Sequence, residues 1–190
     1  MRSFNGPDMV LFLDDALVQS EDVWELLNSY PITVLIPFPV IPANSLLPRM
    51  SLGEAKVRGT VINHGFNHDC FVSMNVITQL MDIFRAALWL QRNGVGSGAR
   101  TLAVPQSNLK FFTRIVLRAF GFKIYVGEKK RFLAISRFPV YGDKVYKECP
   151  WDVSHKRSIL LYTHDVVPNP SDYGCTLESL KSLLNTIFKY

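Results

Sequence analysis

The chain has 190 residues, of which 48% are hydrophobic and 19% are charged, so it can bury one substantial core and is too apolar to be disordered. Its net charge of +5 would suit an anionic partner. The cations look scattered, however, and we find neither a basic helix nor an aromatic-basic ladder, so we expect no nucleic-acid partner.

The cysteine spacing and the first residues of the chain indicate in which compartment the protein resides. The cysteines stand at spacings that fit neither a zinc ribbon nor a disulfide framework, and we expect reduced, buried thiols at Cys70, Cys149 and Cys175. The polar start of the chain does not resemble a signal peptide, and no run approaches the ~18 apolar residues of a membrane span. We therefore expect one soluble domain over residues 1–190, in the cytoplasm, with peripheral membrane association left open.

The first half of the chain predicts strands and helices in alternation. We expect strands at 9–13, 32–36 and 59–62, because these runs are short and apolar and the second is rich in β-branched residues. A helix is predicted over 21–30, where Pro31 stops it. The prolines between 39 and 48 predict a loop. The longest helical pattern runs from 73 to 92, with one stripe of Val76, Leu80, Phe84, Ala87 and Gln91.

The second half continues the alternation. Strands are predicted at 101–104, 123–126, 131–137 and 158–162, and helices at 109–120 and 176–187. The glycine string 93–98 follows a helix, so we interpret it as a flexible connection and not as a phosphate loop. The charged run 128–131 is interpreted as a turn. Strands that alternate with helices of this length indicate an α/β fold with a parallel sheet, open or closed into a barrel.

Polar residues gather where the predicted strands end. Asp14 and Asp15 follow the first strand, His64 and His68 the third, and His164 the last. In parallel α/β folds the carboxyl ends of the strands surround a common site. Two imidazoles and the carboxylate of Asp15 would make a three-ligand site for a divalent ion. Asp14 could then take a proton from the attacking water, and His164 could protonate a leaving group.

These residues, in this order, resemble the polysaccharide deacetylases, the carbohydrate esterases of family 4 that share the chitooligosaccharide deacetylase homology domain. The resemblance rests on three short motifs, 13–15, 64–68 and 163–165, and on the helix-Gly-Phe-strand passage 117–125. It implies a distorted, incomplete (β/α) TIM-like barrel of about seven parallel strands. It also implies Asp14 as catalytic base, Asp15, His64 and His68 as metal ligands, and His164 as acid.

The motif after the fourth strand departs from the family pattern. The family has Arg-Pro-Pro-aromatic-Gly there, and this chain has 103–107, Ala-Val-Pro-Gln-Ser, without the arginine. Pro105 and Gln106 are the candidates for substrate or oxyanion contacts, and Arg100 could replace the arginine only if the register shifts. Ala16 stands where the first motif has glycine, and Trp151-Asp152 is a reversed version of the fourth motif.

Each assignment has a simpler alternative. The aspartate pair could cap a helix or form a solvated turn, the two histidines could form a hydrogen-bonded core pair, and His164-Asp165 could merely end a strand. His155, between charged neighbours, is interpreted as a surface residue.

The leading hypothesis is a zinc-dependent hydrolase, with cobalt, nickel or manganese as alternatives, that removes an acetyl group from an N-acetylated amino sugar of a glycan or its carrier-linked precursor. The competing hypotheses are an inactive deacetylase-like domain that binds a glycan or a protein, and an esterase or amidase that acts on another acylated substrate.

Overall fold

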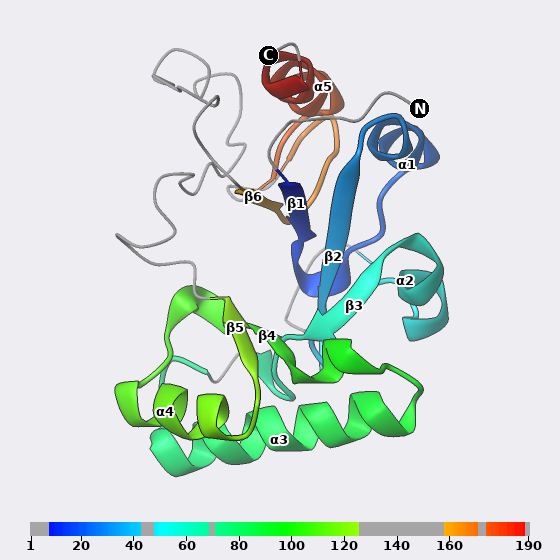
Figure 1. Ribbon diagram of the computed structural model, residues 1–190. Helices are drawn as coiled ribbons and strands as arrows, with labels where there is room; N and C mark the ends of the chain where they lie inside the picture. The colour runs from blue at the N-terminus through cyan, green and yellow to red at the C-terminus, as the bar shows by residue number, and fades with distance from the viewer. Residues whose placement is uncertain (1–7, 43–47, 69–70, 126–157, 171–173, 189–190) are drawn as a thin grey trace.

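The computed structural model describes residues 8–42, 48–68, 71–125, 158–170 and 174–188 (Figure 1). Within them a six-stranded parallel sheet has the order β5-β4-β3-β2-β1-β6. The strands are β1 (Asp8–Leu13), β2 (Ile32–Phe38), β3 (Thr60–Asn63), β4 (Thr101–Ala103), β5 (Lys123–Tyr125) and β6 (Ser158–Thr163). The predicted strand 131–137 lies outside the described residues, so a seventh strand stays a prediction.

The described residues form five α-helices, of which the first four lie between successive strands and the last follows β6. They are α1 (Glu21–Asn28), α2 (Leu52–Arg58), α3 (Val76–Arg92), α4 (Phe111–Ala119) and α5 (Leu177–Phe188). Figure 1 shows α5, α1, α2 and α3 following one another around the outside of the curved sheet. Of the described residues, no helix is long and apolar enough to cross a membrane.

The sheet curls into part of a barrel. Phe12 on β1 and Tyr125 on β5 have ring centroids 5.2 Å apart, although three strands lie between β1 and β5 in the sheet. In a flat sheet four strand spacings would separate them by roughly 19 Å. Their contact therefore requires the two ends of the sheet to approach each other, as expected for the incomplete barrel.

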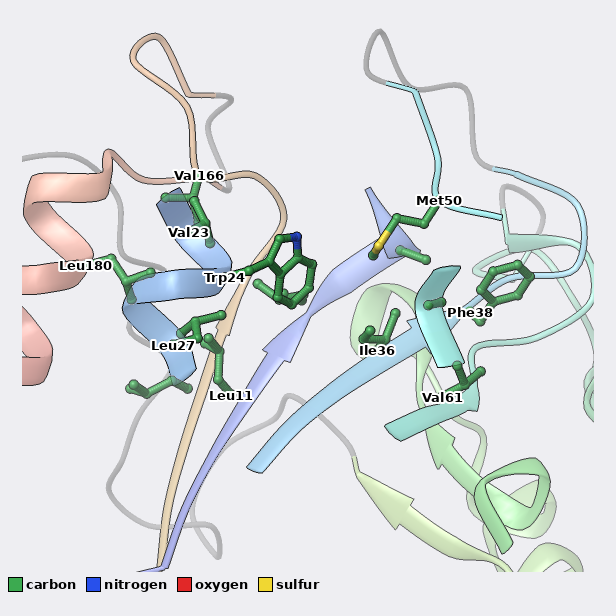
Figure 2. Close-up of a cluster of buried hydrophobic side chains, with 14 of the residues drawn as sticks. Leu11, Val23, Trp24, Leu27, Ile36, Phe38, Met50, Val61, Val166 and Leu180 are labelled. Carbon is green, nitrogen blue, oxygen red and sulfur yellow. The ribbon is translucent and has the colours of Figure 1, made fainter. Parts of the chain in front are cut away.

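The main core fills the space between the sheet and its outer helices. Leu11, Ile36 and Val61 from three strands belong to one buried cluster with Trp24 of α1 and Leu180 of α5 (Figure 2). Neighbouring residues of the same three strands, Phe12, Leu35 and Ile62, form a small cluster on the opposite face together with Ala103 of β4. This alternation is the period-2 pattern of a strand that is covered on both faces.

Three sequence interpretations need correction. Helix α2 was not predicted from the sequence, and Ser51 caps it by accepting a hydrogen bond from the backbone N–H of Glu54. The buried face of α3 carries Ile83, Ala86 and Leu90, so the predicted stripe was rotated, and Gln91 is exposed. One end of the glycine string is closely packed where a flexible connection was expected: a Cβ at Gly98 would lie 1.9 Å from the carbonyl oxygen of Val61, whereas Gly96 has no atom within 4 Å.

Several sequence predictions fall on residues that are not described. The turn 128–131, Cys70, Cys149, Trp151-Asp152 and His155 all lie outside the described residues. Cys175 is a free, buried thiol, and burial raises its pKa to about 11. This agrees with the expectation of a reduced, buried cysteine at that position.

Candidate active site

The carboxyl ends of β1, β3 and β6 bring together all five predicted catalytic and metal-binding side chains. Asp14 and Asp15 occupy the short turn after β1, His64 and His68 the loop after β3, and His164 the position after β6. The two aspartates lie within 3.3 to 3.6 Å of the three histidines. Neither a solvated turn nor a strand-ending cap accounts for such convergence from three separate segments.

Asp15 contacts three histidines through its two carboxylate oxygens. Its Oδ1 is 3.5 Å from Nε2 of His64 and 3.4 Å from Nε2 of His68. Its Oδ2 is 3.6 Å from Nδ1 of His164. His164 therefore contacts a different oxygen of Asp15 from the one that the histidine pair contacts.

The donor set of Asp15, His64 and His68 fits a divalent ion. One ligand atom from each of the three lies within 4.8 Å of the others. An ion with tetrahedral bonds of about 2.0–2.2 Å holds its ligands about 3.3–3.6 Å apart, which matches the two measured separations. Among the described residues, buried Oδ1 of Asp15 and Nε2 of His64 meet no hydrogen-bond partner, which is the condition of ligand atoms that face an ion.

His64 is oriented for that task by the backbone of β4. Its Nδ1 is 2.9 Å from the carbonyl oxygen of Ala103. A carbonyl only accepts, so Nδ1 carries a hydrogen, and loss of the proton on Nε2 leaves the lone pair of that nitrogen directed into the site. The ring is 2% exposed, and this one contact fixes both its tautomer and its direction.

The electrostatics of the site are dominated by the two carboxylates. Burial alone lowers the pKa of His64, but Asp14 and Asp15 outweigh it and raise that pKa to about 9. Burial alone raises the pKa of Asp15, but His64, His68 and His164 outweigh it and hold the pKa well below its usual range. The site thus stabilises negative carboxylates and positive charge placed between them.

Asp82 of α3 holds the loop that carries the two histidines. Its Oδ2 accepts a hydrogen bond of 2.7 Å from the N–H of Phe66, and its Oδ1 one of 2.9 Å from the N–H of Asn67. Gly65 has φ of +85°, and a Cβ there would lie 2.9 Å from Oδ2 of Asp82. Burial raises the pKa of Asp82, and the two N–H donors oppose that rise. Asp82 was not predicted from the sequence as a residue of the site.

Gln19, also missed, joins the loops after β1 and β6. Its side chain is buried, and Nε2 donates to the carbonyl oxygens of Leu17 and His164 at 3.1 and 3.2 Å. Its Oε1 accepts from the N–H of Val166 at 2.9 Å. Gln19 therefore fixes the backbone of His164 relative to the aspartate turn. A lone glutamine offers no sequence pattern that would have revealed this.

Residues with positive φ other than glycine occur in the turns of the site. Asp15 and Ala16 after β1, and Gln106 after β4, have φ of 58°, 51° and 51°. Such conformations cost free energy and tend to cluster at functional sites. Ala16 occupies the position where the deacetylase motif has glycine, and its φ explains why glycine suits that position.

The loop after β4 matches the predictions only in part. Pro105 is buried and its Cγ comes within 3.5 Å of where a Cβ on Gly65 would lie, so it packs beside the histidine loop. Gln106 is exposed. Arg100 is exposed and precedes β4, at the amino end of the strand, so the suggestion that it replaces the missing arginine is wrong. Among the described residues, the ion-pair partners of Asp14 are His64 and His164.

Comparison with known proteins identifies the fold. No protein-family model matches the chain, and no curated protein matches it. Among solved structures, a family 4 carbohydrate esterase from Streptomyces lividans in complex with acetate has a TM-score of 0.58 at 13% identity, covering 97% of this chain and 89% of that one.

Two peptidoglycan deacetylases are also similar in structure. A mutant of PdaC from Bacillus subtilis has a TM-score of 0.54 at 12% identity, covering 97% of this chain and 93% of that one. The peptidoglycan N-acetylglucosamine deacetylase Bc1960, in complex with an N-oxidanyl-benzamide, has a TM-score of 0.53 at 12% identity, covering 98% of this chain and 82% of that one. At these identities the similarity establishes the fold, and in this sense the predicted resemblance to the polysaccharide deacetylases is confirmed.

Proposed function

We propose that this protein is a metal-dependent hydrolase that removes the acetyl group from an N-acetylated amino sugar. The observation that carries the proposal is the arrangement around Asp15: two histidines face one carboxylate oxygen, and a third histidine faces the other. This arrangement would supply a three-ligand ion site, a neighbouring carboxylate and a third imidazole beside it. The fold shared with carbohydrate esterases supports the same chemistry.

Asp15, His64 and His68 would hold the ion, most simply zinc, since imidazole and carboxylate ligands in a three-residue set suit it. When bound, the ion polarises the acetyl carbonyl and lowers the pKa of water. The three ligands are largely buried, whereas the side chains of Asp14 and His164 are 21% and 24% exposed. The acid-base pair is therefore the part of the site that a substrate can reach.

Asp14 and His164 would move the protons. The Asp14 carboxylate accepts a proton from the attacking water as the new C–O bond forms at the acetyl carbon. Protonated His164 then donates its proton to the sugar nitrogen as the C–N bond breaks, which releases acetate and a free amine. The 3.5 Å between Nε2 of His164 and Oδ2 of Asp14 keeps both groups within reach of one tetrahedral carbon and its substituents.

The substrate we propose is an N-acetylhexosamine unit. The name of one structural neighbour specifies peptidoglycan N-acetylglucosamine, and another neighbour binds acetate. We place the substrate in a glycan or on the carrier-linked precursor of one, and the protein in the cytoplasm. Pro105 and Gln106 are proposed to border the acetyl group, because their turn lies beside the histidine loop.

Acetate release tests the proposal. We expect zinc-loaded protein to release acetate from N-acetylglucosamine oligomers and chelated protein to release none. Asp14→Asn and His164→Ala should each lower kcat by about 10² to 10⁴, since each removes one proton-transfer group. Val57→Ser, on the exposed surface of α2, is the matched control and should keep full activity. Full activity in Asp14→Asn and His164→Ala would overturn the assigned roles.

An inactive deacetylase-like domain that binds a glycan or a protein is the second candidate. One observation favours it: the arginine of the family motif is missing, and Arg100 does not replace it. This candidate predicts stoichiometric zinc without turnover on any acetylated sugar. An esterase or amidase of another substrate is the third, and comparing O-acetyl with N-acetyl substrates separates it from the first.

A further inference from the structure

The net positive charge of the protein is concentrated in one part of the chain, although the cations themselves are spread along the sequence. Residues 83–125 contain no aspartate or glutamate and carry seven cations: Arg85, Arg92, Arg100, Lys110, Arg114, Arg118 and Lys123. The whole chain has a net charge of only +5, so the remaining residues together are slightly acidic. The part of the molecule built from most of α3 together with β4, α4 and β5 is therefore strongly basic.

The same part exposes large apolar side chains. On α4, Phe111, Phe112 and Ile115 are 69%, 66% and 49% exposed. At 100° per residue these three fall within about 100° of arc on the outer side of α4, while Thr113 and Leu117 on the inner side are buried. Helix α4 therefore has one apolar face in the core and a second apolar face toward solvent.

Arg118 and Lys110 border this outer face, and both are exposed. At the end of the helix, Phe120 is 59% exposed and packs edge-on against Phe84 of α3, with ring centroids 5.2 Å apart. We call the set of Lys110, Phe111, Phe112, Ile115, Arg118 and Phe120 the α4 surface. Scattered exposed apolar residues are normal, but several aromatic rings bordered by cations on one helix mark a binding surface.

The geometry points to the α4 surface as a docking site for an anionic lipid bilayer. Aromatic rings that insert at the headgroup boundary, flanked by Lys and Arg, are the pattern of interfacial helices. The absence of any carboxylate from residues 83–125 suits a surface of uniform negative charge, whereas the surface of a soluble protein usually carries charges of both signs. Charge complementarity thus selects the lipid surface over a partner protein.

Vesicle sedimentation tests this inference without reference to any enzymatic activity. The purified full chain is mixed with vesicles of equal parts phosphatidylcholine and phosphatidylglycerol, or of phosphatidylcholine alone. We expect binding to the anionic vesicles that weakens with added salt, and far weaker binding to the neutral ones. Failure of the wild-type protein to bind anionic vesicles overturns the inference.

Variants locate the binding surface. The double variant Phe111→Ser and Phe112→Ser should bind at least about tenfold more weakly, because it removes the inserted rings. The double variant Lys110→Gln and Arg118→Gln should lose about tenfold or more and most of the salt dependence. Val57→Ser and Lys181→Gln, which change an exposed apolar residue and a cation on other helices, are the matched controls and should bind as wild type.

Two further outcomes decide against the inference. Unchanged vesicle binding by the Phe111→Ser and Phe112→Ser variant would place the lipid-binding surface elsewhere. A wild-type dimer in solution that this variant converts to monomer, without vesicle binding by either, would show that the α4 surface joins two copies of the chain. Thermal unfolding of each variant confirms that it is folded, as expected for changes to exposed side chains.

Discussion

Asp14 and Asp15 are adjacent in sequence, yet the structure gives them different surroundings. Asp15 is buried, and its two oxygens contact His164 and the pair of histidines after β3. Asp14 is more exposed and contacts His64 and His164. The positive φ of Asp15 turns its side chain into the site. The residue proposed as base and the residue proposed as metal ligand can therefore follow each other directly in the chain.

Asp15→Asn and Asp14→Asn should separate ion binding from proton transfer. We expect Asp15→Asn to lose most of its zinc affinity, because a neutral amide oxygen replaces the only carboxylate ligand. Asp14→Asn should bind one zinc per chain and fail in acetate release. Calorimetric zinc titration of both variants, paired with the acetate assay, checks this. Equal zinc affinity in the two variants would contradict the division of roles.

At the scale of elements, α3 positions two loops of the site through polar residues on its buried face. Asp82 accepts hydrogen bonds from the loop between the histidines. One turn earlier, Gln79 donates to the carbonyl oxygen of Asn108 and accepts from the N–H of Lys110. Helix α3 therefore fixes the loops after β3 and β4 relative to each other.

Asp82→Asn should weaken zinc binding while the fold is kept. An amide has one acceptor oxygen, so one of the N–H groups of Phe66 and Asn67 loses its partner and the histidine loop loosens. We expect zinc affinity to fall by about 10- to 100-fold, as for other groups that orient metal ligands. Met81→Ser, on the exposed side of α3, is the control and should keep its zinc affinity. Unchanged affinity in Asp82→Asn would remove the positioning role.

Gly98 tests how closely the segment before β4 packs on β3. Gly98→Ala would bring a Cβ against the backbone of Val61, and we expect the free energy of unfolding to fall by at least about 2 kcal/mol. Gly53→Ala, in α2 with no atom closer than 3.9 Å, should instead raise it by about 0.5–1 kcal/mol. Urea unfolding measures both free energies. If neither variant loses stability, the close packing at Gly98 is contradicted.

The sequence predicted the strands and the five principal site residues because both follow simple patterns. Buried parallel strands are short apolar runs, and the groups that follow them meet at one edge of the sheet. The sequence did not reveal α2, although Ser51 and Glu54 have capping-box spacing, because Gly53 and the preceding prolines favoured a loop. Asp82 was missed because a carboxylate on an amphipathic helix is normally assigned to the solvent side.

At the scale of the whole molecule, the proposed active site and the α4 surface both lie close to the carboxyl end of β4. The turn Pro105–Ser107 follows β4 at the carboxyl edge, and Lys110 and Phe111 at the start of α4 come directly after it. Docking of α4 on a bilayer would hold this edge near the lipid headgroups. A glycan precursor on a lipid carrier is a substrate that such an arrangement would serve.

The location of the ion tests the central claim most directly. Crystals of the zinc-loaded protein, measured on both sides of the zinc absorption edge, give an anomalous difference map. We predict one strong peak per chain at about 2.0–2.2 Å from Asp15, His64 and His68, with Asp14 and His164 outside the coordination sphere. A map without a peak among these three residues, or with His164 as a ligand, would contradict the proposed site.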